Sequence, residues 1–131
     1  MADRLVDTNI VSFLLKKKPI GRRYQHHLVG HQPVISFMTL AELLEGAERA
    51  HWGDQKRADL ERTLGTYVIV ESSLQLCEIW ARIRAGRRKQ PIAVDDAWIA
   101  AKALAYDCPL ATHNPSDFRG ISGLEIITEA D

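Results

Sequence analysis

The sequence predicts an α/β fold in which a parallel sheet is covered by helices on both faces. Short apolar runs of strand length alternate along the chain with segments whose apolar residues recur at helical spacing. The 131 residues are 46% hydrophobic, which suits a single domain over 1–131 with a sizeable core. No internal repeat, low-complexity segment or long linker divides the chain. Strands in such a fold are buried on both faces.

The expected elements follow each other in a regular order. They are a strand at 3–7, helices at 9–16 and 21–30, a strand at 34–36, helices at 40–52 and 54–64, a strand at 67–70, a helix capped by Ser72 or Ser73, a helix at 95–106, and strands at 109–112 and 124–127. Ile10, Phe13 and Leu14 give the first helix its apolar face, and the linker around Pro19 ends it. A basic break from Gly86 to Pro91 precedes the last long helix.

The net charge, the cysteine count and the lengths of the apolar runs exclude several classes of protein. The formal net charge is zero, so global charge indicates no partner. Cys77 and Cys108 have neither metal-type spacing nor the number that a disulfide framework needs, which favours a reducing compartment. No apolar run approaches the ~20 residues that cross a bilayer, and the first strand follows the N-terminus too closely for a signal peptide. We expect a cytoplasmic protein without a membrane partner.

Asp7 stands where the first apolar run ends and a helical pattern begins. Aspartate in that place is a good N-cap, because its side chain satisfies free N–H groups. The run Asp7-Thr8-Asn9 also sets three oxygen-bearing side chains at a strand end, where ligands of open α/β sheets usually bind. Both roles stay open for this residue.

Glu42 also has two interpretations. Thr39 and Glu42 fit the S/T-x-x-E capping box, in which the glutamate bonds back to the cap residue. The same position lies beside a strand end, so a cap and a functional role can coexist. Gly46, on the same helix face, would allow close approach of a substrate, and Glu45 is a candidate outer group of the site.

Helical geometry separates Asp95 from Asp96. Steps of three and four from Asp96 reach a buried face of small residues that includes Ala103. The same steps from Asp95 reach Lys102, on a face expected to turn toward solvent. Asp96 is therefore the candidate ligand, and Asp95 a cap or an outer acid. The alternative is that both acids only complement the helix dipole.

The stretch from Thr112 to Phe118 follows the fourth expected strand directly. Asn-Pro and Ser-x-Asp are ordinary turn sequences. The hydroxyl of Thr112, the amide of Asn114 and the carboxylate of Asp117 nevertheless come just past a strand end, as Asp7 does. A parallel sheet would bring all these groups to one edge. Crowded carboxylates repel each other and need a cation, and oxygen ligands suit Mg²⁺ or Mn²⁺, which can activate water against a phosphodiester.

Four stretches carry a more specific pattern: Leu5-Val6-Asp7-Thr8-Asn9-Ile10, Ser36-Phe37-Met38-Thr39-Leu40-Ala41-Glu42-Leu43-Leu44-Glu45-Gly46, Asp96-Ala97-Trp98-Ile99-Ala100-Ala101 and Leu110-Ala111-Thr112-His113-Asn114-Pro115-Ser116-Asp117-Phe118. In this order they resemble PIN-domain ribonucleases, and within them the VapC-type toxins of bacterial toxin–antitoxin pairs and the FitB-like proteins. The resemblance covers essentially the whole chain. It implies a PIN-like three-layer fold with about five parallel strands and a Mg²⁺-dependent endoribonuclease.

The resemblance also implies roles for single residues. Asp7, Glu42 and Asp96 would be the three core metal-binding acids. Many PIN domains have a fourth acid where this chain has Asn114, so whether Asn114 or Asp117 completes the site stays open, as does a second metal ion. The secondary candidates around the metal and the substrate are Thr8, Asn9, Thr112, Asp95 and Glu45.

Basic residues cluster in two acid-free stretches. Candidates for contact with RNA phosphates or with an antitoxin are Lys16, Lys17, Lys18, Arg22, Arg23, Arg82, Arg87 and Arg88. The alternative is that these charges only solvate two faces of the protein. His113, within the last motif, is a further group that could touch the substrate.

Together these expectations describe a cytoplasmic toxin that cleaves RNA, most plausibly tRNA, and is neutralised by a VapB-like antitoxin. The resemblance adds a homodimer that forms a higher assembly with the antitoxin. The alternative is a catalytically weak PIN scaffold that binds RNA or serves as the antitoxin-bound partner in autorepression. A phosphatase of the D-x-D type is a third candidate, but Asp7-Thr8-Asn9 lacks the second acid.

Overall fold

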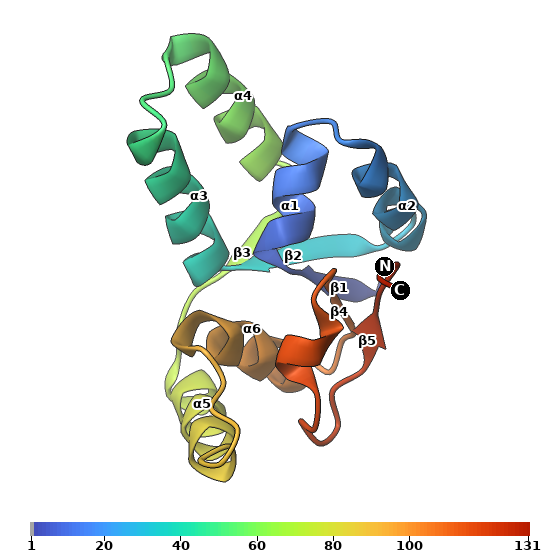
Figure 1. Ribbon diagram of the computed structural model, residues 1–131, viewed down its shortest axis with the longest axis vertical. Helices are drawn as coiled ribbons and strands as arrows, with labels where there is room; N and C mark the ends of the chain where they lie inside the picture. Colours follow the sequence, from blue (N-terminus) through green and yellow to red (C-terminus); the bar gives the residue numbers. More distant parts are fainter. Residues whose placement is uncertain (1) are drawn as a thin grey trace.

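Five parallel strands form one sheet between two layers of helices in the computed structural model, which describes residues 2–131 (Figure 1). The strands are β1 (Asp3–Val6), β2 (Gln32–Ser36), β3 (Val68–Val70), β4 (Leu110–Ala111) and β5 (Ile126–Ile127), in the spatial order β3-β2-β1-β4-β5. The helices are α1 (Thr8–Leu15), α2 (Pro19–Leu28), α3 (Phe37–Arg49), α4 (Asp54–Leu64), α5 (Leu74–Gly86), α6 (Val94–Ala105) and the short 3-10 helix η1 (Pro115–Phe118). The predicted α/β class and parallel sheet are confirmed.

The strands alternate their side chains between two separate cores. Leu5 of β1 faces the layer made by α5 and α6, whereas its neighbour Val6 faces the layer made by α1 to α4. Val34 and Ile35 divide in the same way on β2. Figure 1 shows these two layers below and above the sheet. Strands buried on both faces explain why each appears in the sequence as a short apolar run.

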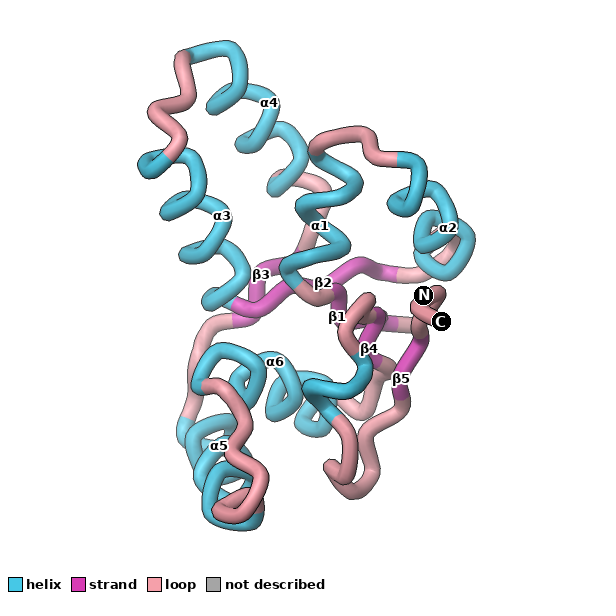
Figure 2. The backbone as a smooth tube through the Cα atoms, in the orientation of Figure 1, coloured by secondary structure: helices cyan, strands magenta, loops and turns pink. Residues whose placement is uncertain are grey.

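The order of the strands reverses beside β1. The chain first builds outward through β2 to β3, then crosses to β4 and β5 on the other side of β1. In open α/β sheets, ligands bind at such a switch point, outside the carboxyl ends of the strands. The loops that follow β1 and β4 therefore lie where a site is expected, and Figure 2 shows both strands at the middle of the sheet.

Several predicted boundaries were wrong by a few residues. The helix predicted at 40–52 runs from Phe37 to Arg49, because Ser36 and not Thr39 caps it: the Ser36 hydroxyl accepts a hydrogen bond from the Met38 amide at 3.0 Å. The predicted start at Asp54 and end at Leu64 of α4 match the structure. Ser73, one of the two proposed caps, accepts a hydrogen bond from the Leu76 amide at the start of α5.

Lys102 contradicts the expectation that its face of α6 turns toward solvent. Its side chain is only 1% exposed. The ammonium group donates to the carbonyl of Val70 at 2.6 Å and to the hydroxyl of Ser36 at 3.2 Å, and lies 3.8 Å from the centre of the Phe37 ring. One side chain of α6 thus joins the ends of β2 and β3 to the start of α3.

Within residues 2–131, none of the helices combines the length and the apolar character needed to cross a bilayer.

Candidate active site

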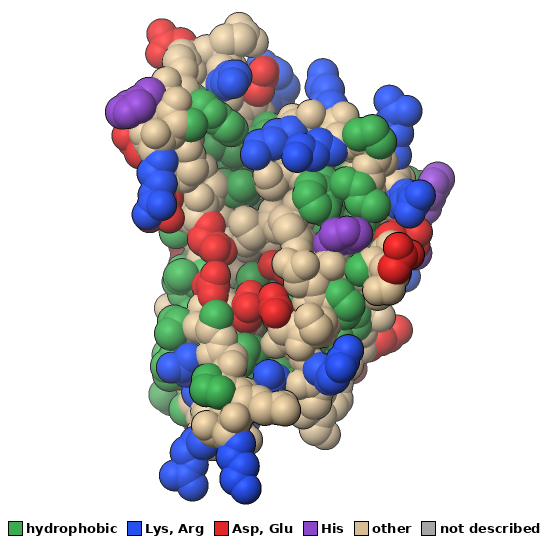
Figure 3. Space-filling model, in the orientation of Figure 1, with side chains coloured by type: hydrophobic (Ala, Val, Ile, Leu, Met, Phe, Trp, Pro, Cys, Tyr) green, Lys and Arg blue, Asp and Glu red, His purple; other side chains and the backbone are tan. Residues whose placement is uncertain are grey.

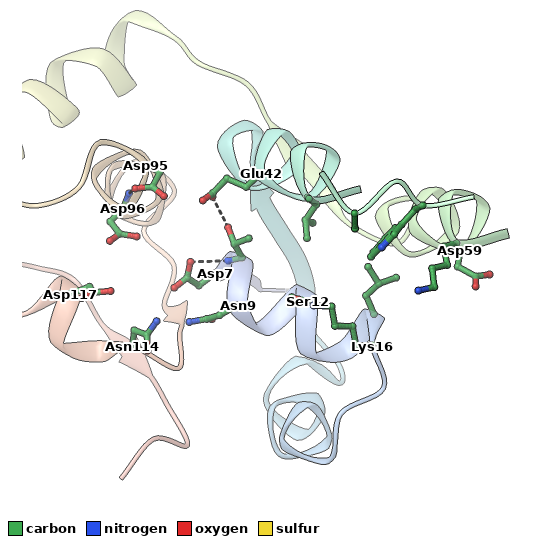
Figure 4. A pocket seen from close by; sticks show the side chains of 17 residues that line it. Asp7, Asn9, Ser12, Lys16, Glu42, Asp59, Asp95, Asp96, Asn114 and Asp117 are labelled. Atoms are coloured by element: carbon green, nitrogen blue, oxygen red, sulfur yellow. Dashed lines mark hydrogen bonds between the residues drawn. The ribbon is translucent and has the colours of Figure 1, made fainter. Parts of the chain in front are cut away.

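A pocket of about 860 Å³ opens at the carboxyl edge of β1 and β4, and most of the predicted site residues line it (Figure 4). They are Asp7, Thr8, Asn9, Glu42, Asp95, Asp96, Asn114 and Asp117. We call this the acidic pocket. In Figure 3, Asp and Glu side chains gather at the middle of this face, with Lys and Arg side chains above and below them. The structure therefore brings together acids that are up to 110 residues apart in the sequence.

Asp7 sits at the base of the acidic pocket and is almost completely buried. One carboxylate oxygen accepts a hydrogen bond from the backbone amide of Thr8 at 2.7 Å, which caps α1. The other accepts one from the hydroxyl of Thr112 at 2.7 Å. That hydroxyl in turn accepts a hydrogen bond from the Asn114 amide at 3.0 Å. Asp7 is thus both a helix cap and the link between β1 and the turn after β4.

Glu42 is held by a chain of hydroxyl groups rather than by a capping box. The hydroxyl of Thr8 donates to Glu42 at 2.9 Å and therefore accepts the proton of the Thr39 hydroxyl, also at 2.9 Å. Thr39 lies inside α3 and is fully buried. The predicted capping box was wrong, because Ser36 already satisfies the free amide groups at the start of the helix. Glu42 keeps its other oxygen for the pocket.

Asp95 and Asp96 both reach the acidic pocket from the first turn of α6. Ala93 is the N-cap residue of this helix, so Asp95 is not the cap. One oxygen of Asp95 accepts a hydrogen bond from the Asp96 amide at 2.9 Å. Figure 4 shows the side chain of Asp96 on the side of Asp7 and Asp117, and that of Asp95 above it, on the side of Glu42.

Asn114 and Asp117 enter the pocket from the turn after β4, so the structure places both candidates for the fourth position. The buried Oδ1 atom of Asn9 has no hydrogen-bond partner among residues 2–131, although the residue lines the same space. Glu45 is not part of the pocket lining. Its side chain is exposed and pairs with Arg49 at 3.3 Å, one turn further along α3.

The crowding of acids changes their proton affinities. Burial is the largest cause that raises the pKa of Asp7, against the lowering effect of its hydrogen bonds from Thr112 and Thr8. Burial, the contact with Asp95 and nearby negative charges raise the pKa of Glu42 to about 7. Burial and the charges of the other acids raise the pKa of Asp96 to about 7 as well. A cation bound next to these carboxylates would lower their pKa values again.

The groups that line the acidic pocket suit a hard divalent metal ion. They offer carboxylate, hydroxyl and amide oxygens, including the unpartnered Oδ1 of Asn9, and no thiol or imidazole. Among residues 2–131, no three acidic, histidine or cysteine side chains are close enough to enclose an ion by themselves. Mg²⁺ commonly keeps several waters and needs few protein ligands, so an open ring of acids fits it better than it fits Ca²⁺ or zinc.

The basic residues divide between two ends of the acidic pocket. Lys16 lines the pocket itself, and Lys17, Lys18, Arg22 and Arg23 are exposed next to it in sequence, on the turn between α1 and α2 and on the start of α2. At the other end, a hollow of about 480 Å³ runs from Asp96 and Asp117 to Arg87 and Arg119.

In the second basic stretch, which includes Arg82, Arg87 and Arg88, one arginine is already engaged in hydrogen bonds within the protein. Arg87 donates hydrogen bonds to the carbonyl groups of Gln90 and Arg119, both at 2.8 Å, and so holds two loops together. Arg82 and Arg88 are exposed, and Arg82 lines a separate hollow against the loop at 120–122.

Sequence reasoning missed one wall of the acidic pocket. Trp52, Lys56 and Asp59 line it from α4 and the turn before it, and Ser12 lines it from α1. The Lys56 ammonium lies 5.6 Å from the centre of the Trp52 ring. No motif marks these residues, because their place depends on how α4 folds back over α1. The only available signal was the polar side chain of Ser12 one helical turn after Thr8.

Comparison with known proteins gives a consistent result along the whole chain. A sequence model of the PIN domain matches residues 4–124. Ribonuclease VapC1 of Haemophilus influenzae strain R2866 is 32% identical over 125 residues, which are 92% of this chain and 93% of that protein. The tRNA(fMet)-specific endonuclease VapC of Shigella flexneri is 29% identical over 122 residues, 92% of each chain.

Solved structures agree with the sequences. The chain superposes on DNA-bound VapBC from Salmonella typhimurium with a TM-score of 0.85 and 28% identity over 98% of each chain. VapBC-1 from nontypeable Haemophilus influenzae gives a TM-score of 0.82 and 31% identity over 96% of this chain and 97% of that one. The fold and the ring of acids thus define a PIN domain, and the chain belongs to that family. Within the family it is a VapC-type ribonuclease toxin of the toxin–antitoxin class.

Proposed function

We propose that this protein cleaves RNA, with tRNA as the first candidate substrate, at a Mg²⁺ site held by Asp7, Glu42 and Asp96. The observation that carries the proposal is that acids from several separate elements line one pocket. Burial and then the neighbouring acids raise the pKa values of Asp7, Glu42 and Asp96, and a cation would offset both effects. Mn²⁺ has similar oxygen preferences and could replace Mg²⁺. When bound, such an ion lowers the pKa of water and stabilises the oxygens of a phosphodiester during in-line attack.

The residues of the chain have separate tasks in this proposal. Asp7 is fixed by two hydrogen bonds and offers its remaining lone pairs to the ion. Thr8 orients Glu42, so that the carboxylate approaches from α3 with one oxygen free. Asp95 supports Asp96 from behind through the backbone of α6. These contacts hold the ligands in place before the substrate arrives, which lowers the cost of orientation in the transition state.

We assign the fourth position to Asp117, with Asn114 as a neutral neighbour. The negative charge of Asp117 raises the pKa of both Asp7 and Asp96, whereas an amide contributes no such charge. The side chain is exposed at the mouth of the pocket, which suits contact with a water on the ion or with the substrate. Thr112 acts through Asp7, and Asn9 offers an amide oxygen to the hydrated ion.

The proposal includes a partner and a location. Solved relatives include a toxin–antitoxin complex from Klebsiella pneumoniae, 27% identical with a TM-score of 0.79. By analogy, a VapB-like antitoxin would neutralise this chain in the cytoplasm. A homodimer would cover the apolar side chains exposed on β3 and α3, namely Val68, Ile69 and Leu44. Such dimers would join into a higher assembly with the antitoxin.

The test is the variant Asp7→Asn. We expect RNA cleavage to fall by more than the 10–100-fold that outer groups of metal sites cost, and the stabilisation by Mg²⁺ to disappear. Circular dichroism should show the fold unchanged, because asparagine also caps helices. Asp3→Asn, at the opposite end of β1, is the matched control and should cleave normally. Full activity of Asp7→Asn, or cleavage that persists in EDTA, contradicts the proposal and favours the RNA-binding scaffold.

Sequencing of RNA ends after brief expression identifies the substrate. A single cleavage position in tRNA is the expected result. Cuts confined to ribosomal RNA would reject tRNA but keep the ribonuclease.

A further inference from the structure

The ring of His113 is held on two sides, although nothing in the mechanism above uses it. It makes edge-to-face contacts with Phe13 of α1 and Tyr24 of α2, at centroid separations of 5.5 and 5.7 Å and interplanar angles of 83° and 86°. The Nδ1 atom lies 2.6 Å from the Tyr24 hydroxyl. Tyr24 is fully buried, whereas His113 is partly exposed. A histidine fixed in this way presents one edge of its ring in a defined direction.

The hydrogen bonds of Tyr24 determine which nitrogen of His113 carries the proton. The Tyr24 hydroxyl accepts a hydrogen bond from the Glu129 amide at 2.9 Å. We assign its single proton to Nδ1 at 2.6 Å, because its other oxygen neighbours, in Thr112 and Thr128, are 3.4 and 3.5 Å away. With this assignment, a neutral imidazole carries its proton on Nε2. Nε2 makes no hydrogen bond to residues 2–131, and His113 is partly exposed, so this nitrogen is available to a ligand.

The position of this donor relates it to the acidic pocket. Thr112, the residue before it, binds Asp7, and Asn114, the residue after it, lines the pocket. Phe13 and Tyr24 belong to the two helices joined by the basic turn that begins at Lys16. His113 thus stands between the turn that lines the pocket and the two helices that the basic turn joins. A polynucleotide that lies over this turn and over α2 would pass its ring.

We propose that Nε2–H of His113 binds a phosphate oxygen of the RNA strand next to the phosphodiester that is cleaved, and that Tyr24 is its positioning residue. The proposal rests on the proposed function. A ring N–H group held in a fixed direction can position a phosphate oxygen, as polar side chains do in nucleic-acid interfaces. His113 acts in binding and needs no proton transfer.

The main experiment compares steady-state cleavage of unfractionated tRNA in Mg²⁺ by the parent and His113→Ala. One lost hydrogen bond to a charged group raises KM about tenfold, with kcat within about twofold of the parent. His113→Gln keeps a donor of similar reach and should recover most of the loss. Tyr24→Phe keeps the ring contacts but removes the hydroxyl group that bonds to Nδ1 of His113. The tautomer of His113 is then no longer fixed, and KM should rise by a smaller factor. The control is His26→Ala, an exposed histidine of α2 without a contact to the pocket, which should leave KM unchanged.

Two further measurements separate this role from a structural or metal-binding one. The slope of log KM against log salt should be the same in His113→Ala and the parent, since a neutral donor displaces no counterion. The rise of Tm with Mg²⁺ should also be unchanged. An unchanged KM, a lost Mg²⁺ effect, or weaker binding of antitoxin peptide with unchanged RNA binding overturns the proposal. If His113→Ala does not fold, His113→Gln and Tyr24→Phe decide.

These outcomes are distinct from failure of the proposed function. If Asp7→Asn stays active, or the parent does not cleave RNA, the ribonuclease site itself is wrong. If Asp7→Asn is inactive and His113→Ala keeps the KM of the parent, only the role of His113 is wrong.

Discussion

Asp96 shows most directly what the acidic pocket does to one residue. Burial and then the charges of the other acids raise its pKa to about 7 from the usual 3.8. The folded, metal-free protein therefore binds this proton more tightly than the unfolded chain does. Stability from this group falls as pH rises from about 4 to about 7 and stays low above that. Glu42, with a pKa near 7, adds an effect of the same sign.

The variant Asp96→Asn should not lose this stability as the pH rises from about 4 to about 7. In EDTA at pH 8 we expect its Tm to exceed that of the parent by a few degrees, because one of the repelling charges is gone. The difference should shrink toward pH 4, where both states of the parent carry the proton. Thermal melts at pH 4, 6 and 8 measure it, with Asp3→Asn as the control. A variant that is less stable than the parent at pH 8 would show that Asp96 does not bear this repulsion.

Single-residue reasoning from the sequence located the acids but not their hydrogen bonds. Asp7 could be found because oxygen-bearing side chains at a strand end are unusual in an apolar run. The chain of hydroxyls from Thr39 through Thr8 to Glu42 could not, because it links α1 to α3 across the sheet edge. Trp52 and Lys56 carry no local signal either, and only the fold brings them to the pocket.

At the scale of elements, Lys102 joins more of the structure than any local pattern suggests. Its buried ammonium holds the ends of β2 and β3 against α6. Burial lowers its pKa to about 8 from the usual 10.5. Between these values the unfolded chain binds more protons than the folded one, so stability from this group rises with pH from about 8 to 10.5 and stays low below about 8.

Lys102→Met should abolish this pH dependence. Between pH 7.5 and 9.5, the free energy of unfolding of the parent should rise by about 1–2 kcal/mol relative to the variant. Denaturant titrations at the two pH values give the difference, since other titrating groups cancel in the comparison. Parallel curves for the two proteins would mean that Lys102 titrates normally, despite its burial.

The order and type of elements were predictable, whereas their ends were less so. Helical spacing and short apolar runs gave every long helix and all five strands in sequence order. The predicted ends differ from the observed ones because three helices end without a glycine. Lys17, His51 and Asp107 adopt positive φ angles of 56°, 52° and 49° after α1, α3 and α6. Residues of these types rarely adopt that conformation, so the sequence contains no stop signal there.

At the scale of the whole molecule, the formal net charge of zero hides a separation of charge. Acids gather at the middle of one face and basic side chains lie at either end of it (Figure 3). An RNA strand laid across this face would meet basic residues first and the acids at its centre. The geometry favours electrostatic binding that depends on salt even though the protein carries no net charge.

The variant Lys16→Ala tests this separation of charge, because Lys16 lines the acidic pocket from the turn between α1 and α2. RNA binding by the Asp7→Asn protein should weaken, and the slope of log K against log salt should fall by about one. Fluorescence anisotropy of a labelled tRNA from about 50 to 300 mM KCl measures both. Arg49→Ala, which removes an exposed arginine paired with Glu45 outside the pocket, should leave the slope as it is. An unchanged slope for Lys16→Ala would place the RNA elsewhere.

The hydrogen bond from Thr112 to Asp7 joins residues 105 positions apart, and β1 lies between β2 and β4 in the sheet. During translation, Asp7 leaves the ribosome early, while the partner strand that fixes it is among the last segments made. Asp96, Asn114 and Asp117 also arrive late. An incomplete nascent chain therefore lacks the strand and the turn that complete the acidic pocket. The order of strands in the sheet thus delays assembly of the acidic pocket until nearly the whole polypeptide has been made.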